Sequence, residues 1–517
     1  MVVSIRRLLL ALAFVASSTV EASYQTIPSK FSPDNGVRVK KLSDGQLCNG
    51  GGDHYTGWLD IGRKHLFYWY HPSRKGETNA PTMIWLQGGP GGSSLAGMLM
   101  ENGPCLLDAE KNATYYNPHA WNEEFNVVYL DQPVGVGYSY MSPSPGDNGT
   151  VDEDEFPSRT EESALDFVVA LKLFYEAFPA LATKPLYIAG ESYAGRYVPM
   201  YASSILAYNA QLGEVLPAAG GGNGARIPLV SIAVGNGWTS PYHQVPSLYD
   251  EGCYPADDSL EPLFNETECA AMATAVNRCE TLLQACIDVP DGLVCRQAGA
   301  FCDGHLLAPV NDKLVSRYDR TLHCTAPDKC YPLADYMAEW LNSPEVRAVL
   351  EIDAQVGAAD PVDGSAFVFE SYIIARRYLA SGDMYTSTVP ALQHVLDSGE
   401  VEILYYVGLH DWICNGLGLQ RMWDSVHWTR HAAFRATKNV PLSWTLADGR
   451  PAGVVRQVDG LAVAQLNGGG HLYPMDQPVS ALRMVRQWKT ELEEKKGRAT
   501  VRIGFEAKQQ HQLSMEL

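Results

Sequence analysis

The sequence predicts an α/β fold with a mostly parallel sheet covered by helices on both faces, and with an inserted helical subdomain. Short apolar segments of strand length alternate with segments of helical periodicity along most of the chain. This alternation is typical of a parallel sheet. Between Trp238 and Ser381 the alternation is lost, and this stretch holds eight of the 11 cysteines. We therefore expect a disulfide-stapled helical cap, inserted into the core.

The composition is that of a large globular protein. The chain has 517 residues, of which 46% are hydrophobic and 19% are charged. A net charge of -20, with no dense run of Lys and Arg, argues against nucleic acid as a partner. After the N-terminus, no apolar run reaches the length of about 20 residues that spans a bilayer. We expect neither a nucleic-acid partner nor a membrane span, and the oligomeric state stays open.

The N-terminus has the polarity of a secretory signal peptide. Arg6 and Arg7 precede an apolar run, and small residues then lead to Ala22. We expect residues 1–22 to be removed and the chain to enter the secretory pathway, to be secreted or delivered to a vacuole or lysosome. Three glycosylation sequons agree with that route, at Asn112, Asn148 and Asn265.

The elements follow in order after a polar segment, 23–47, which we expect to be an irregular arm or short leader with a processing site at Lys40-Lys41. The alternation from Tyr55 to Ser73 predicts two antiparallel strands that turn at Gly62. Further strands are predicted at 82–86, 126–130, 186–189, 229–234, 401–407 and 461–466, and helices at 163–178 and 479–494. The expected divisions are a first core part (48–237), the cap (238–381), a second core part (382–494) and a polar C-terminal tail (495–517).

The stretch LYIAGESYAGRYVP, from Leu186 to Pro199, predicts a nucleophile elbow. An apolar strand runs into Gly190, and Ser192 then lies on a turn of small residues that opens a helix. A sharp turn of this kind presents the serine hydroxyl to substrate and the next N–H to a developing oxyanion. The pattern is G-E-S-Y-A-G, so glycine comes three places after the serine rather than two.

A second glycine-rich segment follows the strand at 82–86. Residues 87–94 read Q-G-G-P-G-G-S-S, which would let backbone N–H groups face a ligand. Such a loop serves as a phosphate cradle or as part of an oxyanion hole. No P-loop lysine follows it, and in hydrolases the loop after the third strand supplies an oxyanion donor.

Two further polar residues follow strands. Asp411 comes after the strand at 401–407, and His471 follows glycines after the strand at 461–466. With Ser192 they stand in the order nucleophile, acid, histidine, which is that of the α/β-hydrolase fold. We expect His471 to take the Ser192 proton and return it to the leaving amine, while Asp411 fixes the tautomer of the imidazole.

Four motifs in this order closely resemble the serine carboxypeptidases of the carboxypeptidase Y and fungal carboxypeptidase S1 type, over about residues 50–490. They are W-L-Q-G-G-P-G-G-S-S at Trp85, G-E-S-Y-A-G at Gly190, D-W-I-C-N at Asp411 and G-G-H-L at Gly469. The resemblance implies an α/β-hydrolase core with a helical cap. It also implies removal of C-terminal residues from peptides and proteins in an acidic compartment or medium.

The resemblance also implies roles for residues around the triad. Gly89 and Tyr193 would supply the oxyanion hole through their backbone N–H groups. Trp238 would line the first side-chain pocket, or simply pack there, and Cys414 would be a free thiol beside the substrate. The substrate carboxylate would be bound by Gln87, Gly88, Glu101 and Glu191.

Two positions depart from the family pattern. The family usually has asparagine at the position of Gln87, so the amide lies one methylene further out here. Many members have cysteine at the position of Gly92, bridged to the cap. No cysteine lies between Cys330 and Cys414 in this chain, so both partners of that bridge are absent.

Ten cysteines can form five bridges in an oxidising compartment and leave one thiol, but spacing alone leaves the connectivity open. Zinc is the rival use of cysteine, yet no C-x-x-C pair or H-E-x-x-H helix occurs, so we expect no metal and no cofactor. The resemblance implies four cap bridges, and the fifth pair remains once Cys414 is left free. The expected pairs are Cys253–Cys269, Cys279–Cys302, Cys286–Cys295, Cys324–Cys330 and Cys48–Cys105.

Other functions remain open on this fold. The triad indicates acyl transfer, so an acyltransferase or an esterase is an alternative to a peptidase. The carboxylate-binding pair Glu101 and Glu191 favours peptides with a free C-terminus. A non-catalytic interaction protein is a further alternative, although its usual sign is a broken triad, and the triad here is intact.

Overall fold

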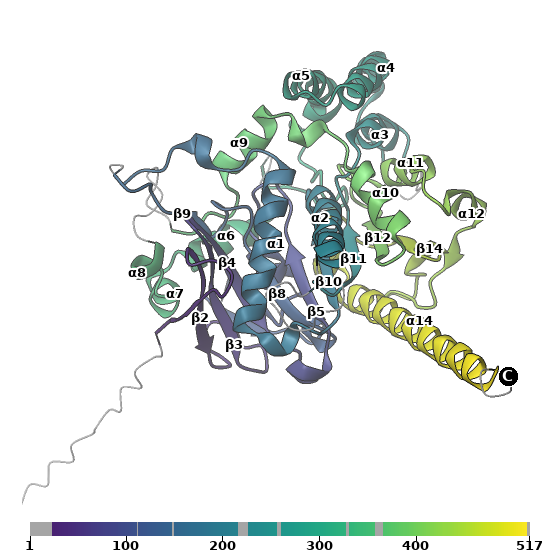
Figure 1. Ribbon diagram of the computed structural model, residues 1–517. Coiled ribbons are helices and arrows are strands. Elements are labelled where there is room, and N and C mark those ends of the chain that lie inside the picture. Colours follow the sequence, from purple (N-terminus) through teal and green to yellow (C-terminus); the bar gives the residue numbers. More distant parts are fainter. Residues whose placement is uncertain are drawn as a thin grey trace, which may run out of the picture.

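A computed structural model describes residues 23–110, 112–146, 149–215, 226–255, 260–326, 330–356 and 366–513 (Figure 1). Within this part of the chain one 13-stranded sheet runs through the molecule in the order β1-β2-β3-β4-β8-β5-β10-β11-β12-β15-β14-β13, with β9 beside β4. The central strands are β8 (Asn126–Leu130), β5 (Thr82–Leu86), β10 (Leu186–Glu191), β11 (Leu229–Gly235), β12 (Glu402–Gly408) and β15 (Leu461–Leu466). The strands on the two flanks are β1 (Gln25–Pro28), β2 (Asn35–Leu42), β3 (His54–Ile61), β4 (Lys64–His71), β9 (Tyr140–Met141), β13 (Val440–Pro441) and β14 (Gly453–Val458).

The sheet is mixed, with a parallel centre. The six central strands pair in parallel, whereas every ladder outside them is antiparallel. The expected parallel sheet is therefore the central part of a larger one. The central strands are apolar on both faces because helices cover both, as parallel strands require.

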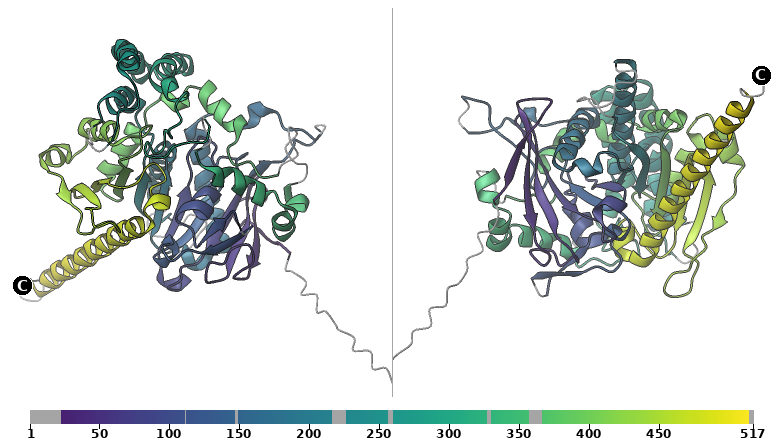
Figure 2. Two further views of the ribbon diagram at one scale, coloured as in Figure 1. Left: turned by 180° about the vertical axis from the view of Figure 1, so that it is seen from behind. Right: turned by 60° about the horizontal axis from the view of Figure 1, so that its bottom comes forward.

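Alternate side chains of the central strands enter two separate cores. Ile84 and Ile188 pack on the face covered by α1 (Thr160–Ala177) and α2 (Ala194–Val215). Met83 and Tyr187 pack on the opposite face, which is covered in part by the first turns of α14 (Pro478–Leu513). Figure 2 shows the molecule from behind and with its bottom turned forward, and in both views α14 extends away from the body of the molecule.

The N-terminal segment corrects our expectation of an irregular arm. β1 and β2 continue the main sheet, and β2 pairs with β3 over its whole length. Lys40 is buried, and its Nζ donates to Glu351 Oε1 at 2.7 Å. Apolar residues such as Val37 face the core and alternate with polar residues. The polar residues make the segment look irregular in the sequence. Lys40 thus belongs to the folded domain and is not an open processing site.

The inserted region between β11 and β12 is helical, as expected. Its α-helices are α3 (Pro241–Cys253), α4 (Glu266–Asp288), α5 (Gly292–Cys302), α6 (Pro332–Leu341), α7 (Pro344–Val349), α8 (Ile352–Val356), α9 (Tyr372–Ala380) and α10 (Val389–Ser398). Short turns of helix complete it, at η6 (Asp303–Leu307), η7 (Ala308–Val310) and η8 (Asp383–Tyr385).

Five disulfides join the ten paired cysteines. Four of them staple the cap, and the fifth ties the N-terminal part of the core to β6 (Cys105–Asp108), which pairs with β7 (Ala113–Tyr116). The pairs are Cys48–Cys105, Cys253–Cys269, Cys279–Cys302, Cys286–Cys295 and Cys324–Cys330, which are the five that we expected. Cys414 is the free cysteine.

The C-terminal region also differs from expectation. α14 continues to Leu513, so the polar residues from 495 onward extend a helix instead of forming a separate tail. The remaining elements of the core are α11 (Gly416–Ser425), α12 (His431–Ala436) and α13 (Tyr473–Asp476), with short helical turns η1 (Glu77–Asn79), η2 (Gly97–Glu101), η3 (Trp121–Glu123), η4 (Glu153–Glu155) and η5 (Pro179–Leu181). Among the described residues, no helix is both long and apolar enough to cross a membrane.

Candidate active site

Ser192 lies on a sharp turn between β10 and α2. Its φ is +64°, a left-handed conformation that is uncommon for residues other than glycine. Hydrogen bonds hold this conformation on both sides, because Ser192 N donates to Gly235 O at 3.0 Å and Trp238 N donates to Ser192 O at 2.8 Å. Gly190 must be small, since a Cβ there would lie 2.5 Å from Leu86 O. The expected elbow is thus present, and a hydrogen bond to the end of β11 stabilises it.

Asp411 and His471 meet at the ends of β12 and β15. His471 Nδ1 lies 2.7 Å from Asp411 Oδ2, and His471 N donates to Tyr318 O at 2.7 Å. His471 Nε2 has no hydrogen-bond partner among the described residues, and His471 lines the same cavity as Ser192. This arrangement leaves one imidazole nitrogen available toward the cavity, which is the geometry a general base needs.

Asp411 is held in place by three further donors. Its Oδ1 accepts from the backbone N–H of Ile413 at 3.0 Å and of Cys414 at 3.3 Å, and its Oδ2 accepts from Asn236 Nδ2 at 2.8 Å. These bonds satisfy a buried carboxylate and fix its orientation.

Asn236 is a site residue that our sequence reasoning missed. Its Nδ2 reaches Asp411 while its Oδ1 accepts from Gly408 N at 3.1 Å, and its own φ is +42°. An asparagine between two glycines directly after a buried strand was the available signal, because asparagine tolerates left-handed backbone and can bond neighbouring chains.

The glycine-rich loop lies directly against the elbow. A Cβ on Gly88 would lie 2.5 Å from Tyr193 N and 2.6 Å from Ser192 Cβ, so only glycine fits there. Gly89 has a φ of +110°, which also requires glycine. The loop therefore brings its backbone beside Tyr193 N, where two N–H groups could face one oxygen atom.

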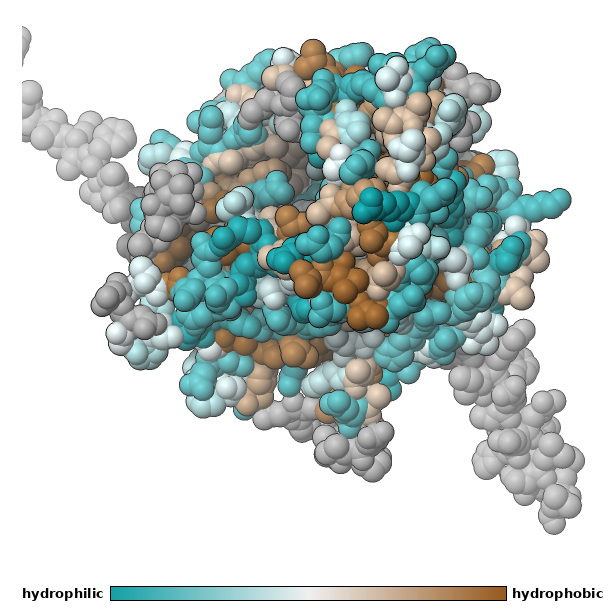
Figure 3. All heavy atoms as spheres, turned by 90° about the horizontal axis from the view of Figure 1, so that it is seen from above, coloured by the Kyte–Doolittle hydropathy of each residue, from teal (hydrophilic) through white to brown (hydrophobic). Residues whose placement is uncertain are grey.

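A cavity of about 530 Å³ opens between the core and the cap. The core supplies Gln87, Gly88, Gly89, Glu101, Ser192 and His471 to its lining, and the cap supplies Arg317, Tyr318, Tyr331 and Glu370 among others. Figure 3 looks down on the face that carries the cap, where hydrophobic side chains lie among hydrophilic ones. Trp238 and Cys414 are not among the residues that line this cavity, and the expectation that they lie beside the substrate stays a prediction.

Both residues are buried close to the triad, since Trp238 N donates to Ser192 O and Cys414 N donates to Asp411 Oδ1. Trp238 is 7% exposed and donates from Nε1 to Met384 O at 2.8 Å. Cys414 is buried, and burial together with nearby Asp411 raises the pKa of its thiol well above the ordinary value. Cys414, Asp411 and His471 bring ligand atoms within 4.8 Å of one another, but the hydrogen bond between Asp411 and His471 already accounts for two of the three.

Two neighbouring glutamates are buried at the cavity, where Glu101 is part of the lining and Glu191 is bonded to the lining residue Gln87. Gln87 connects to them, because its Oε1 accepts from Trp85 Nε1 at 3.0 Å and its Nε2 donates to Glu191 Oε1 at 3.0 Å. Burial raises the pKa of Glu101 to about 7, and burial and the neighbouring Glu101 raise the pKa of Glu191 well above its ordinary value. At least one carboxyl of this pair is therefore protonated in acid.

Two of the expected glycosylation sites are in the described part of the chain. Asn112 and Asn265 are exposed, and Asn265 caps α4 through a hydrogen bond that its side chain accepts from Glu268 N at 3.0 Å. Asn148, like the expected signal peptide 1–22, lies outside the described residues.

The fold and the site together define a serine hydrolase of the α/β-hydrolase class. Residues 48–491 match the family model of the serine carboxypeptidases, and the chain belongs to this family. It is a serine-type carboxypeptidase with an α/β-hydrolase core and a helical cap.

Named relatives agree with this assignment. The chain is 33% identical over 465 residues to carboxypeptidase Y homolog A of Emericella nidulans, a match that covers 87% of this chain and 76% of the relative. It is 34% identical over 467 residues to the protein of that name from Aspergillus niger, covering 87% and 75%. Among solved structures, a prohormone-processing carboxypeptidase from Saccharomyces cerevisiae has the same fold, with a TM-score of 0.68, 20% identity, and coverage of 90% of this chain and 93% of that chain.

Proposed function

We propose that the chain removes C-terminal residues from peptides and proteins at acidic pH, through an acyl-enzyme formed on Ser192. The observation that carries the proposal is a pair of neighbouring buried carboxyls, Glu101 and Glu191. Glu101 lines the cavity that holds Ser192 and His471, and Glu191 accepts a hydrogen bond from Gln87, which also lines it. A protonated carboxyl donates a hydrogen bond to a peptide carboxylate, whereas two ionised glutamates would repel it. Terminal recognition beside a nucleophile yields an exopeptidase.

In the proposed reaction, His471 Nε2 takes the Ser192 hydroxyl proton as the oxygen attacks the last peptide carbonyl. The hydrogen bond from Nδ1 to Asp411 stabilises the imidazolium that results. Backbone N–H groups of Gly89 and Tyr193 would stabilise the oxyanion, which is usually the largest single contribution to such a reaction. His471 then gives its proton to the leaving amine, the terminal amino acid departs, and water hydrolyses the acyl-enzyme by the same steps.

Gln87, Gly88, Glu101 and Glu191 would bind the substrate carboxylate. Gln87 is pre-oriented, because Trp85 Nε1 occupies its carbonyl oxygen and leaves the amide nitrogen directed at Glu191. The side chain one methylene longer than the family's asparagine is thus accommodated by a fixed partner. The proposal needs no metal or cofactor.

We also propose that the protein reaches its place of action through the secretory pathway and is glycosylated at the exposed Asn112 and Asn265. The five disulfides support this route, since such bridges persist in oxidising compartments. Extracellular and vacuolar or lysosomal destinations both fit.

The test is digestion of a peptide library in three forms, with free, amidated and methyl-esterified C-termini. A carboxypeptidase produces ladders shortened from the free C-terminus, read by mass spectrometry, and Ser192→Ala produces none. Hydrolysis of simple esters without any shortening of free peptides would favour an esterase, and transfer of acyl groups to an added alcohol without net hydrolysis would favour an acyltransferase.

A further inference from the structure

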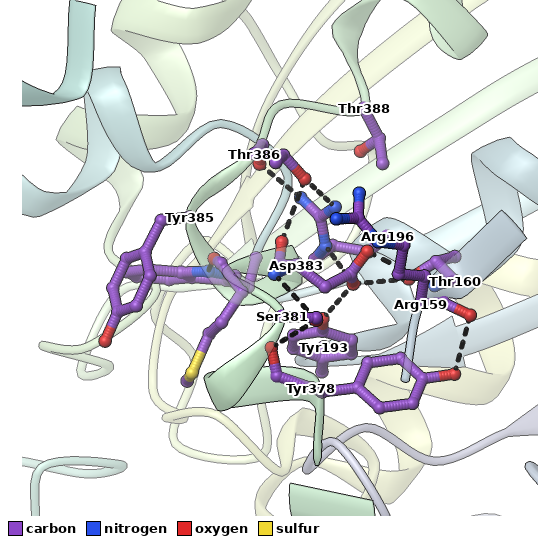
Figure 4. A network of polar contacts seen from close by, with 12 residues as sticks. Arg159, Thr160, Tyr193, Arg196, Tyr378, Ser381, Asp383, Tyr385, Thr386 and Thr388 are labelled. Carbon is purple, nitrogen blue, oxygen red and sulfur yellow. Dashed lines mark hydrogen bonds and ion pairs between the residues drawn. The ribbon is translucent and has the colours of Figure 1, made fainter. Parts of the chain in front are cut away.

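The loop that follows α9 contacts the residues directly after Ser192, and residues 383–388 are not among those that line the cavity. Asp383, at the start of η8, is 2% exposed and lies within a network of polar contacts (Figure 4). Its Oδ2 accepts from Tyr193 OH at 2.5 Å and from Thr160 Oγ1 at 2.7 Å, and its Oδ1 accepts from Thr160 N at 3.2 Å. Arg196 Nε lies 3.3 Å from Oδ2. Tyr193 is the residue whose backbone N–H faces the glycine-rich loop.

This carboxylate is ionised despite its burial. Burial by itself would raise its pKa, but Arg196 and the hydrogen bonds from Tyr193 and Thr160 hold the pKa below the ordinary value. A buried charge with several good partners is rigid, because moving any of them leaves a polar group unpaired. The tyrosine side chain is therefore anchored at its hydroxyl.

Further contacts of the same loop bind the elbow at neighbouring positions. Arg196 donates to the carbonyl oxygen of Thr386 and, at 2.5 Å, to its Oγ1. Thr388 Oγ1 donates to Gly195 O at 3.2 Å, and Met384 O accepts from Trp238 Nε1 at 2.8 Å. The loop from 383 to 388 thus contacts the turn of α2 that immediately follows Ser192.

The opposite side of η8 is bound to the cap. Tyr385 OH donates to Asp303 in η6, and the ring packs on Gly299 so closely that a Cβ there would lie 2.0 Å from it. Tyr385 O also lies 3.5 Å from Sγ of Cys286, which belongs to the disulfide Cys286–Cys295. The loop is therefore fixed between the stapled cap and the elbow.

We propose that Asp383 is a positioning residue for the oxyanion hole, which it aims by holding the Tyr193 side chain through its hydroxyl. The inference rests on the proposed function, in which Tyr193 N–H stabilises the oxyanion. Such donors work because they are oriented before the reaction, so a small displacement weakens transition-state binding while substrate binding is retained. Asp383 itself touches neither substrate nor reacting atoms.

The test is Tyr193→Phe, which removes one hydroxyl and keeps the ring. We expect kcat to fall about tenfold, less than the 10² to 10³ that follows complete loss of one oxyanion donor, with KM unchanged. Affinity for a peptide boronate, which mimics the tetrahedral intermediate, should fall by the same factor, while affinity for a non-cleavable peptide with a free C-terminus should not change. The matched control is Tyr70→Phe on β4. It likewise removes one tyrosine hydroxyl that donates to a carboxylate, in this case Glu77 at 2.7 Å.

Asp383→Asn provides a second variant, and the double variant Tyr193→Phe/Asp383→Asn completes a cycle. If both residues act through their mutual bond, the double variant loses no more kcat than the worse single variant. Tyr193→Phe could instead keep the wild-type kcat and boronate affinity and lose only as much Tm as Tyr70→Phe does. That result would show that the bond between Tyr193 and Asp383 is purely structural, and it would overturn the proposal. Labelling of Ser192 by a fluorophosphonate requires no peptide substrate, so its rate tests the proposal even if the wild type proved inactive on peptides. A tenfold slower labelling of Tyr193→Phe supports the proposal, and an unchanged labelling rate overturns it.

Discussion

His471 Nδ1 lies 2.7 Å from Asp411 Oδ2, and the same oxygen accepts from Asn236 Nδ2 at 2.8 Å. The amide nitrogen of Asn236 can only donate, so Oδ2 of Asp411 accepts from it. Because the same oxygen also accepts from His471, the imidazole carries its proton on Nδ1. The tautomer that frees Nε2 to act as a base is thus set by a chain of three residues, each at the end of a different parallel strand.

Asp411→Asn tests this chain of bonds. The new amide can present its nitrogen to His471 or to Asn236, and either choice disfavours the productive tautomer. We expect kcat to fall about 10⁴-fold with little change in KM. The measurement is steady-state kinetics on a free peptide together with Tm, and Asp397→Asn, at an exposed aspartate that accepts from Thr429, is the control. A loss below about tenfold would remove Asp411 from the triad.

The pH dependence of KM tests the carboxyl pair. The pKa of Glu101 lies at about 7, and burial and the neighbouring Glu101 also raise the pKa of Glu191, so below pH 7 a protonated carboxyl can donate to the substrate terminus. As the pH rises through 7 this donor becomes a repelling charge. We expect KM for a free peptide to rise about tenfold or more between pH 5 and 8, because a hydrogen bond to a charged group contributes about 1.5–3 kcal/mol.

An amidated peptide of the same sequence is the comparison substrate, since it lacks the third charge. Its KM should be higher in acid and nearly flat with pH, and Glu191→Gln should flatten the profile of the free peptide. Parallel profiles for the two substrates in the wild type would contradict recognition of the terminus by the carboxyl pair.

The same pair makes a prediction for stability. A carboxyl whose pKa is raised on folding stabilises the folded state when the pH is below the pKa of the unfolded state. This contribution is lost as the pH rises through the pKa of the folded state. The window for Glu101 runs from its unfolded value near 4.5 to about 7. Glu191→Gln removes the repulsion at high pH, so its free energy of unfolding relative to wild type should rise by on the order of 2 kcal/mol between pH 4.5 and 7.5. Denaturant unfolding at the two pH values measures it, and a relative stability that falls with pH would contradict the account.

Cys414 provides a chemical test of the cysteine assignment. Cys414 is 3% exposed and the pKa of its thiol is raised, so little thiolate is available. We expect iodoacetamide to leave the native protein unmodified and to add one label per chain after denaturation without reductant. Peptide mapping should find that label on Cys414. A denatured chain that takes up no label would mean that Cys414 is bridged.

The central strands, the elbow and the order of the triad could be predicted from the sequence because each has a strong local signal. β5 is a continuous apolar run that leads through Gln87 into glycines, and β10 is an apolar run that reaches Gly190 and Glu191 just before Ser192. β2 was missed because its register is visible only from its pairing with β3, and its polar face hides it. Asn236 and Asp383 were missed for a different reason, because their partners lie 175 and 190 residues away in the chain.

The cap shows the same limit. Cysteine density predicted a stapled helical insertion, but only the structure shows that its end contacts the elbow through Asp383 and Arg196. Trp238 and Cys414 are buried and are not among the residues that line the cavity, so a role for them beside the substrate stays a prediction.

The most direct test of the account is a titration of carboxypeptidase activity against covalent labelling of the wild-type protein with a fluorophosphonate. The account predicts that one label per chain abolishes shortening of free peptides, that activity falls in proportion to label incorporated, and that peptide mapping finds the label on Ser192. Full labelling of Ser192 with peptide shortening undiminished, or loss of activity with the label on another residue, would contradict it.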